Sequence, residues 1–251
     1  MLPHAVERAA ALLVDARRSG RPLVALPPAL SPTTIDGAYA IQDAVIRRLG
    51  GVAGWKVGAR APDAEPICAP IPTGRTFASP KRFGPNELRL RGIEAEIAFR
   101  IGRDLPPRSR PYTADEVATA VESAHAAIEV VESRFVDFRT AEPLAVLADS
   151  NSNGALAHGP PRGHAVRIDQ TAQAAGLSFG GDEVACTVGG NPAGDVWRLV
   201  AWLANHCAAR CGGLRAGELV TTGSCTGLLF APAGTRVVAE LAGLGRAVVE
   251  V

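Results

Sequence analysis

The run GIEAEIAFRIGRDL, residues 92–105, places two glutamates inside an apolar stretch that favours a β-strand. Side chains alternate between the two faces of a strand, so we expect Glu94 and Glu96 to point to the same side. Two carboxylates on one face of a largely apolar strand repel each other unless a positive group lies between them. The run therefore predicts either a strand with one solvated face or a strand that binds a cation.

A third carboxylate, Glu129, stands in the run AAIEVVESRF, where branched apolar neighbours leave little room for an exposed strand. Three carboxylates with few histidines nearby form the oxygen-rich ligand set that Mg²⁺ or Mn²⁺ prefers. Such an ion would remove the repulsion between Glu94 and Glu96. We therefore expect Glu94, Glu96 and Glu129 to hold Mg²⁺ or Mn²⁺, and a solvated sheet face remains the alternative.

The bulk composition narrows the class of protein. The chain has 251 residues, 47% of them apolar, which is enough for a sizeable buried core. Its formal net charge is +1 and it has no block of lysine and arginine, so neither nucleic acid nor an anionic membrane is expected as a partner. Charges such as Glu7 and Asp15 interrupt the apolar N-terminal stretch, which argues against a signal peptide or membrane span and predicts a cytoplasmic protein.

Helical patterns dominate the first part of the chain and strand patterns the second. Helices are expected over residues 4–19, over residues 35–49 after a cap at Thr33 or Thr34, over residues 113–127 behind a capping box, and over residues 194–213. Strands are expected over 52–59, 88–101, from 128 onward, and over 164–169, 175–181, 183–190, 218–227 and 235–251. This order favours an α+β fold over a doubly wound sheet.

The segment of residues 60–86 is rich in proline and glycine, so we expect a long irregular loop. It joins the strand of Lys56 to the strand of Glu94, and a lid over the metal site that orders on substrate binding is therefore predicted. A rigid surface loop is the alternative. Trp55 and Val57 indicate that the strand around Lys56 is buried, and a surface lysine is the other interpretation.

Five motifs, in this order, resemble those of the 2-keto-4-pentenoate hydratase family, which belongs to the fumarylacetoacetate hydrolase superfamily. They are GWKVGA, GIEAEIAFRIGRDL, AAIEVVESRF, ADSNSNGALAHG and LRAGELVTTGSCTG. The likeness covers roughly residues 35–230, and the two glutamate-bearing strands are its most specific part.

The resemblance implies a mixed β-roll or distorted barrel with a small, mostly helical N-terminal lobe. It places the lobe at residues 1–75 and the catalytic domain at residues 76–251. The family forms homo-oligomers, so we expect one here. The long helix that carries Trp197 and Trp202 is the candidate to bury apolar residues against another subunit.

The resemblance also implies roles for individual residues. Glu94, Glu96 and Glu129 match the metal ligands, and Lys56 matches a lysine of the active site that transfers a proton or stabilises negative charge. A nearby cation is expected to lower the pKa of Lys56. The expected substrate-binding residues are Ser152, Thr222, Gly223 and Thr226. Apart from the resemblance, Arg134 is a further candidate that could recognise a second carboxylate of the substrate, with a surface residue as the alternative. Ile67 stands where the family has an acidic residue, and Glu65 is the nearest candidate for that second catalytic group.

Hydratases of this family add water to a 2-hydroxy-2,4-dienoate and give a 4-hydroxy-2-oxo acid. The resemblance therefore implies a metal-dependent hydro-lyase that acts on a small 2-oxo or 2-hydroxy-dienoate acid, as in the catabolism of aromatic compounds. Related decarboxylases share the metal site and act on a 2-oxo-enedioate, so decarboxylation is one alternative. A member that binds an oxo acid without catalysis is the other.

Overall fold

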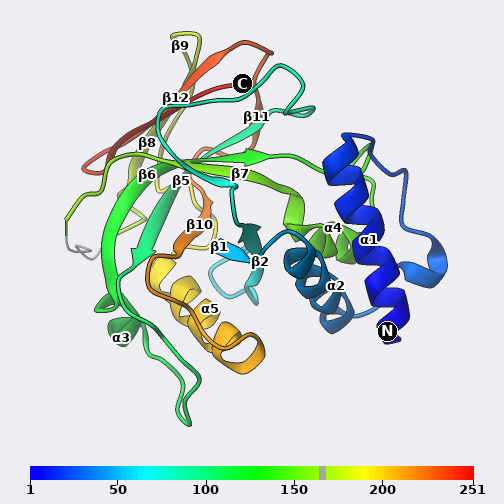
Figure 1. Cartoon of the computed structure of the whole chain (residues 1–251). Helices are drawn as coiled ribbons and strands as arrows, with labels where there is room; N and C mark the ends of the chain where they lie inside the picture. Colours follow the sequence, from blue (N-terminus) through cyan, green and yellow to red (C-terminus); the bar gives the residue numbers. More distant parts are fainter. Residues whose placement is uncertain (164–167) are drawn as a thin grey trace.

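Two mixed sheets and a set of helices make up the computed structural model, which describes residues 1–163 and 168–251 (Figure 1). In order of pairing, the larger sheet contains β2 (Ile67–Pro72), β1 (Val52–Gly58), β10 (Leu219–Ser224), β5 (Gly92–Ile101), β6 (Val121–Val131), β7 (Asn153–His158) and β3 (Thr76–Ala78), with β11 (Leu229–Phe230) on β5. The smaller sheet contains β4 (Lys81–Arg82), β13 (Gly245–Glu250), β12 (Arg236–Leu241), β8 (Ala174–Phe179) and β9 (Asp182–Val188). Among the described residues neither pairing path closes on itself, so the expected α+β fold with mixed sheets is confirmed.

The helices lie in two groups (Figure 1). The N-terminal group contains α1 (Pro3–Ser19), the 3₁₀ turn η1 (Pro28–Leu30), α2 (Ile35–Arg48) and α4 (Pro143–Ala148); α1 and α4 both contact α2. The second group contains α3 (Ala114–Ala118) and α5 (Val196–Arg210), which contact each other. Thr34 is the cap of α2, because its hydroxyl accepts a hydrogen bond from the Gly37 N–H at 3.1 Å.

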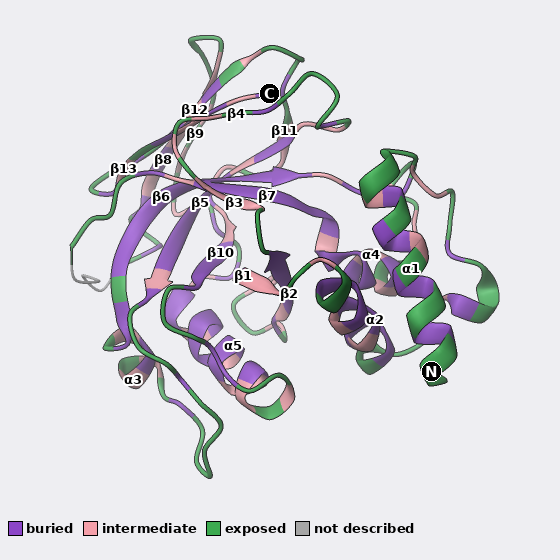
Figure 2. Ribbon diagram, viewed as in Figure 1, coloured by how far each residue is buried: buried purple, intermediate pink, exposed green. Residues whose placement is uncertain are grey.

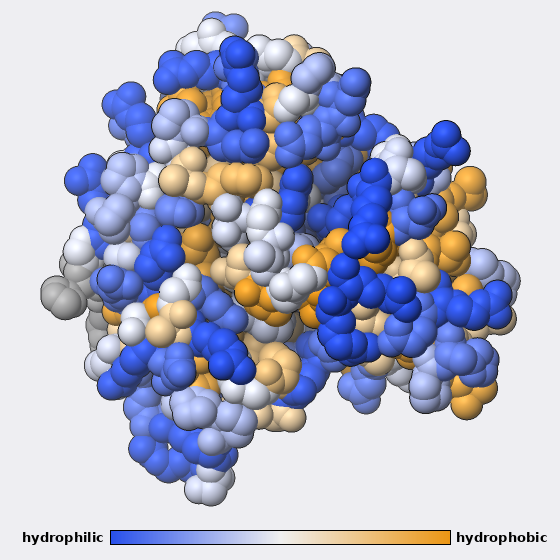
Figure 3. Space-filling model, viewed as in Figure 1, coloured by the Kyte–Doolittle hydropathy of each residue, from blue (hydrophilic) through white to orange (hydrophobic). Residues whose placement is uncertain are grey.

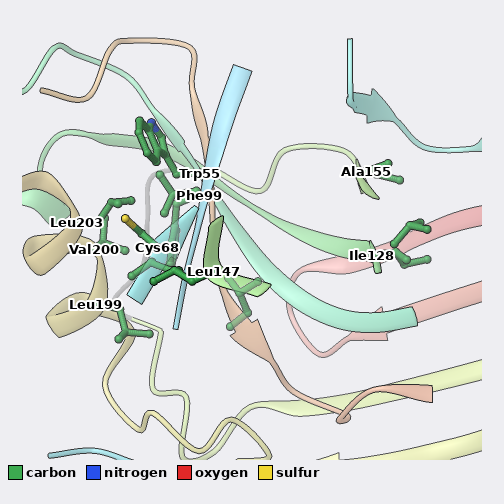
Figure 4. Close-up of a cluster of buried hydrophobic side chains, with 14 of the residues drawn as sticks. Trp55, Cys68, Phe99, Ile128, Leu147, Ala155, Leu199, Val200 and Leu203 are labelled. Carbon is green, nitrogen blue, oxygen red and sulfur yellow. The ribbon is translucent and has the colours of Figure 1, made fainter. Parts of the chain in front are cut away.

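One part of the hydrophobic core lies where α5 meets the larger sheet. Leu199, Val200 and Leu203 project from α5 toward Trp55 on β1 and Phe99 on β5 (Figure 4). The middle strands of the sheet are buried along most of their length (Figure 2). The face seen in Figure 3 is mostly hydrophilic, with apolar patches near its centre.

The long helix does not present both of its tryptophans to the outside. Trp197 is 7% exposed and packs against Phe99, with ring centroids 4.8 Å apart. Trp202 is half-buried and stacks on His206 of the same helix. The predicted subunit contact through Trp197 is therefore wrong, because residues of the same chain already cover that side chain. The homo-oligomer itself stays a prediction.

The segment of residues 60–86 is not an irregular loop, which corrects the sequence-based interpretation. Within it, β2 pairs antiparallel with β1, from Gly58 opposite Ile67 to Val52 opposite Pro72, and β2 is largely buried. β2 is the last strand in the pairing order of its sheet, where prolines are tolerated because one side of the strand needs no N–H donors. A lid formed by the whole segment is incompatible with this pairing.

The helix expected over residues 113–127 is much shorter than predicted. Its capping box is confirmed, since Thr113 and Glu116 exchange the two expected hydrogen bonds. The helix ends at Ala118, and β6 begins at Val121 and pairs with β5 along its whole length. Non-local pairing thus overrides the helix propensity of the alanine-rich sequence.

The proposed boundary at residue 75 cuts through the larger sheet, because β1 and β2 both precede it and belong to that sheet. The division into residues 1–75 and 76–251 stays a prediction.

In the strand expected over residues 164–169, residues 164–167 lie outside the described residues. Every helix among the described residues is too short or too polar to cross a membrane.

Phe99 is fully buried between the sheet and α5. Replacing Phe99 by alanine should lower the free energy of unfolding by about 3–5 kcal/mol, because the cavity left under Trp197 cannot fully collapse. Val24, which is 85% exposed, is the matched control, and Val24→Ala should change stability by less than about 0.5 kcal/mol. Urea unfolding followed by circular dichroism measures both variants. Equal stability of the two would contradict this account of the core.

Candidate metal centre

Strand register brings the three predicted carboxylates together. Glu94 on β5 lies directly opposite Glu129 on β6, and Glu96 lies two residues further along the same face. One carboxylate oxygen from each of the three residues can be chosen so that all lie within 4.8 Å of one another. The predicted same-face arrangement of the glutamates is confirmed.

The pKa values of these carboxylates reflect their crowding. Glu129 and Glu96 are buried, and Glu94 is half-buried. Burial and the charge of Glu129 raise the pKa of Glu94 to about 7. Burial, followed by the charges of Glu129 and Glu94, raises the pKa of Glu96 well above its ordinary value. The three side chains therefore resist simultaneous ionisation unless a positive group joins them.

Lys56 supplies one such positive group. It reaches the cluster from β1, which is linked to β5 through β10, and its Nζ donates to Oε1 of Glu129 at 2.6 Å. Burial lowers the pKa of Lys56, but the charges of Glu129, Glu94 and Glu96 raise it above its ordinary value overall. The surrounding side chains thus shift this pKa in the direction opposite to the predicted lowering.

The donor set also fits a divalent cation. Oε1 of Glu129 accepts hydrogen bonds from Lys56 and, at 3.0 Å, from Nδ2 of Asn153. Oε2 of Glu129 is buried and has no hydrogen-bond partner among the described residues. A buried carboxylate oxygen without a partner is costly, and a hard cation coordinated by oxygen would satisfy it.

The loop between α4 and β7 borders the cluster. It contains the 3₁₀ turn η2 (Ser150–Ser152), whose three residues have φ values of 51°, 47° and 58°. Such left-handed backbone is strained for residues other than glycine. The carbonyl of Asn151 accepts from Lys56 at 3.1 Å, and the Ser152 hydroxyl is buried with no partner among the described residues. The loop therefore borders the site through the Asn151 carbonyl, and substrate binding by Ser152 stays a prediction.

Arg134 is held by contacts within the chain, and its role in substrate binding stays a prediction. Its side chain is 3% exposed and forms a salt bridge through Nε to the Asp149 carboxylate. Nη1 donates to the carbonyl of Asn153 at 2.9 Å, and Nη2 donates to the carbonyl of Asp149 at 2.7 Å. These contacts hold the guanidinium against the backbone of the loop.

Glu65 does not join the carboxylate cluster. Its carboxylate accepts a hydrogen bond from Nε1 of Trp202 on α5 at 2.6 Å, in an exposed position. Ile67 begins β2 and lies opposite Gly58. The assignment of Glu65 as the second catalytic group is therefore not supported by its position.

The late turn contacts β5 through three predicted residues. The Thr222 hydroxyl donates to the carbonyl of Ile97 at 3.3 Å, and the Thr226 hydroxyl accepts from the N–H of Ala95 at 3.2 Å. The N–H of Gly223 donates to Oε2 of Glu96 at 3.1 Å. Gly223 has a φ of 95°, which favours glycine. Among these three residues, Gly223 is the one with a hydrogen bond to a carboxylate of the cluster.

Asn153 was missed by the sequence reasoning. It is fully buried at the start of β7, and its amide orients Glu129. It lies inside the polar stretch ADSNSNG, where nothing in the sequence distinguishes it from Asn151.

Apolar side chains share the sheet face of the carboxylates. The register places Ala98 beside Glu96 on β5, Ala127 opposite Glu96, and Leu156 opposite Glu129. With Ile71 and Leu219 they form a small buried cluster separate from the main core. The site therefore combines a charged centre with an apolar floor.

Comparison with known proteins agrees with this geometry. Residues 71–251 match the fumarylacetoacetate (FAA) hydrolase C-terminal family. A 2-keto-4-pentenoate hydratase of Paraburkholderia xenovorans (strain LB400) is 30% identical over 98% of this chain and 94% of the relative. 2-Keto-4-pentenoate hydratase 2 of Dechloromonas aromatica (strain RCB) is 32% identical over 96% of this chain and 95% of the relative.

Among solved structures, 4-oxalocrotonate decarboxylase from Pseudomonas putida G7, complexed with magnesium and adipate, has a TM-score of 0.88. It is 22% identical and covers 100% of this chain and 98% of its own, so the likeness concerns the fold. The family match and the full-length relatives lead to one conclusion: the chain belongs to the 2-keto-4-pentenoate hydratase family, within the fumarylacetoacetate hydrolase superfamily.

Proposed function

We propose that the protein is a divalent-metal-dependent hydratase that converts a 2-hydroxy-2,4-dienoate into a 4-hydroxy-2-oxo acid. The observation that carries this proposal is the contact between Nζ of Lys56 and Glu129 inside a cluster of three carboxylates. It joins a group able to transfer a proton to a ligand set for a hard cation. The hydratases that are about 30% identical over nearly the whole chain support the same reaction class.

Glu94, Glu96 and Glu129 would hold the cation, which we propose to be Mg²⁺ or Mn²⁺. The related decarboxylase structures contain magnesium in one case and calcium in another. When bound, the cation would draw electrons from the C2 oxygen of the substrate and stabilise the negative charge that develops there.

Lys56 is the proposed proton carrier. The reaction removes the proton of the C2 hydroxyl and places a proton on C5, which leaves an α,β-unsaturated 2-oxo acid. The oxygen of water then adds at C4, and a proton is placed on C3. The Nζ of Lys56 stands 2.6 Å from Glu129, so the pair can hold a proton beside the reacting oxygen and pass it on.

Other residues of this chain would orient the substrate. The Ser152 hydroxyl, which has no partner among the described residues, is the proposed donor to the substrate carboxylate. The turn with Thr222, Gly223 and Thr226 would close the pocket beside Glu96. The apolar floor under the carboxylates would contact the hydrocarbon part of the dienoate and exclude water from it.

Product analysis tests the reaction. With Mg²⁺ and 2-hydroxypenta-2,4-dienoate, the protein should form 4-hydroxy-2-oxopentanoate, detected by mass spectrometry. Lys56→Met should lower kcat by about 10²- to 10⁴-fold, because the proton carrier is lost. Release of CO₂ from a 2-oxo-enedioate, with no hydration of the dienoate, would identify a decarboxylase instead. A protein that binds oxo acids and turns over neither substrate would contradict both enzymes.

Glu129→Gln tests the metal site directly. The substitution keeps the shape of the side chain but removes a negative charge, so affinity for Mn²⁺ should fall by about tenfold or more. Electron paramagnetic resonance of free Mn²⁺ measures the affinity without any substrate. Glu122→Gln, at an exposed position of the same strand, is the matched control and should leave affinity unchanged. Equal affinity in the two variants would exclude Glu129 as a ligand.

The stability of the metal-free protein should fall as pH rises, whereas the stabilisation that Mg²⁺ provides should grow. The pKa of Glu94 in the folded chain is about 7 and its ordinary value is 4.5, so its contribution to stability is present below the ordinary value and is lost as pH rises through about 7. Ionised carboxylates bind metal, so Mg²⁺ should raise Tm more at about pH 8 than at about pH 6. Thermal melts with Mg²⁺ and with chelator measure this difference. A Tm increase from Mg²⁺ that is independent of pH would contradict the assigned ligands.

A further inference from the structure

A cavity of about 540 Å³ lies between the C-terminal end of α1, the segment of residues 85–89 and the chain around the ends of β6 and β7. Its lining shares no residue with the carboxylate cluster or with Lys56. Five arginines line it against two glutamates, Glu87 and Glu132, so the lining carries an excess of positive charge. The arginines are Arg17, Arg18, Arg75, Arg89 and Arg134.

Three of these guanidinium groups converge on one short piece of backbone. Nη2 of Arg17 and Nη1 of Arg134 both donate to the carbonyl of Asn153, at 2.8 and 2.9 Å. Nε of Arg75 donates to the next carbonyl, that of Gly154, at 2.7 Å. Because the guanidinium groups of Arg17 and Arg134 donate to the same carbonyl, their two positive charges lie side by side at the wall of the cavity.

The three guanidinium groups differ in their charge partners. Arg134 pairs with Asp149, and Arg75 pairs with Glu87 at 3.0 Å. Arg17 forms no salt bridge within the described part of the chain, and its pKa is lowered to about 9 by burial and by the charge of Arg134. The charges of Asp149 and Glu132 offset only part of this effect, so the buried positive charge of Arg17 is incompletely balanced.

Free hydrogen-bond donors remain on two of these side chains. Arg17 uses Nη2, which leaves Nε and Nη1 without a partner among the described residues. Arg75 uses Nε and Nη1, which leaves Nη2 likewise. Planar guanidinium groups with several free N–H donors match the oxygens of carboxylate and phosphate groups.

We propose that this cavity binds a small dianion, a phosphate or a short-chain dicarboxylate, through Arg17 and Arg75. The site is independent of the proposed hydratase reaction, because it shares no side chain with the metal centre. Occupancy would neutralise the part of the Arg17 charge that Asp149 and Glu132 leave unbalanced.

Isothermal titration calorimetry on the metal-free protein tests the site, with inorganic phosphate in one series and succinate in another at constant ionic strength. Saturable binding of at least one anion is expected, and the series with the lower Kd identifies the preferred class. Arg17→Gln should raise the Kd by about tenfold or more. Arg8→Gln, at an exposed position of the same helix, is the matched control and should leave the Kd unchanged.

Two results of the titration would contradict the proposed anion site. No saturable binding of either anion would overturn the proposal, and so would equal affinities in Arg17→Gln and the unsubstituted protein. Circular dichroism shows whether Arg17→Gln is folded, and Arg17→Lys replaces it in the comparison if it is not, with weaker binding expected because the planar fork is lost. Since no metal or dienoate is present, failure here leaves the hydratase proposal untouched, and the reverse also holds.

Discussion

Repulsion among Glu94, Glu96 and Glu129 is the constraint on which the rest of the site depends. Antiparallel pairing of β5 and β6 sets these carboxylates opposite and beside one another on one face. Lys56 offsets part of this repulsion with its positive charge. It lies on β1, and β10 separates that strand from β5. Oε2 of Glu129 is buried without a hydrogen-bond partner among the described residues, and a bound cation would satisfy it.

The parts of this arrangement that follow from local sequence could be predicted. Alternation in GIEAEIAFRI indicates a strand and puts Glu94 and Glu96 on the same face, and the register confirms it. The capping box at Thr113 likewise predicts where α3 begins. Its end could not be predicted, because it is set by the pairing of β6 with β5, which local propensity does not report.

The amino-acid composition of a segment predicts the wrong local structure where pairing with a distant strand determines that structure. Prolines around β2 suggested a loop, yet the strand is at the edge of its sheet and satisfies its hydrogen bonds there. The contacts of Arg134 and Asn153 could not be predicted for a related reason. Their roles depend on the left-handed backbone of Ser150–Ser152, and no pattern of apolar and polar residues encodes that conformation.

The strained turn Ser150–Ser152 has a consequence for how this protein can vary. Lys56 holds the Asn151 carbonyl inside the turn, and Arg134 holds the carbonyls of Asp149 and Asn153, which flank it. Substitutions that let the turn relax would favour the folded state locally, while they would move the Asn151 carbonyl away from Lys56. Selection for a more robust chain and selection for an intact charge cluster therefore act in opposite directions on these three residues.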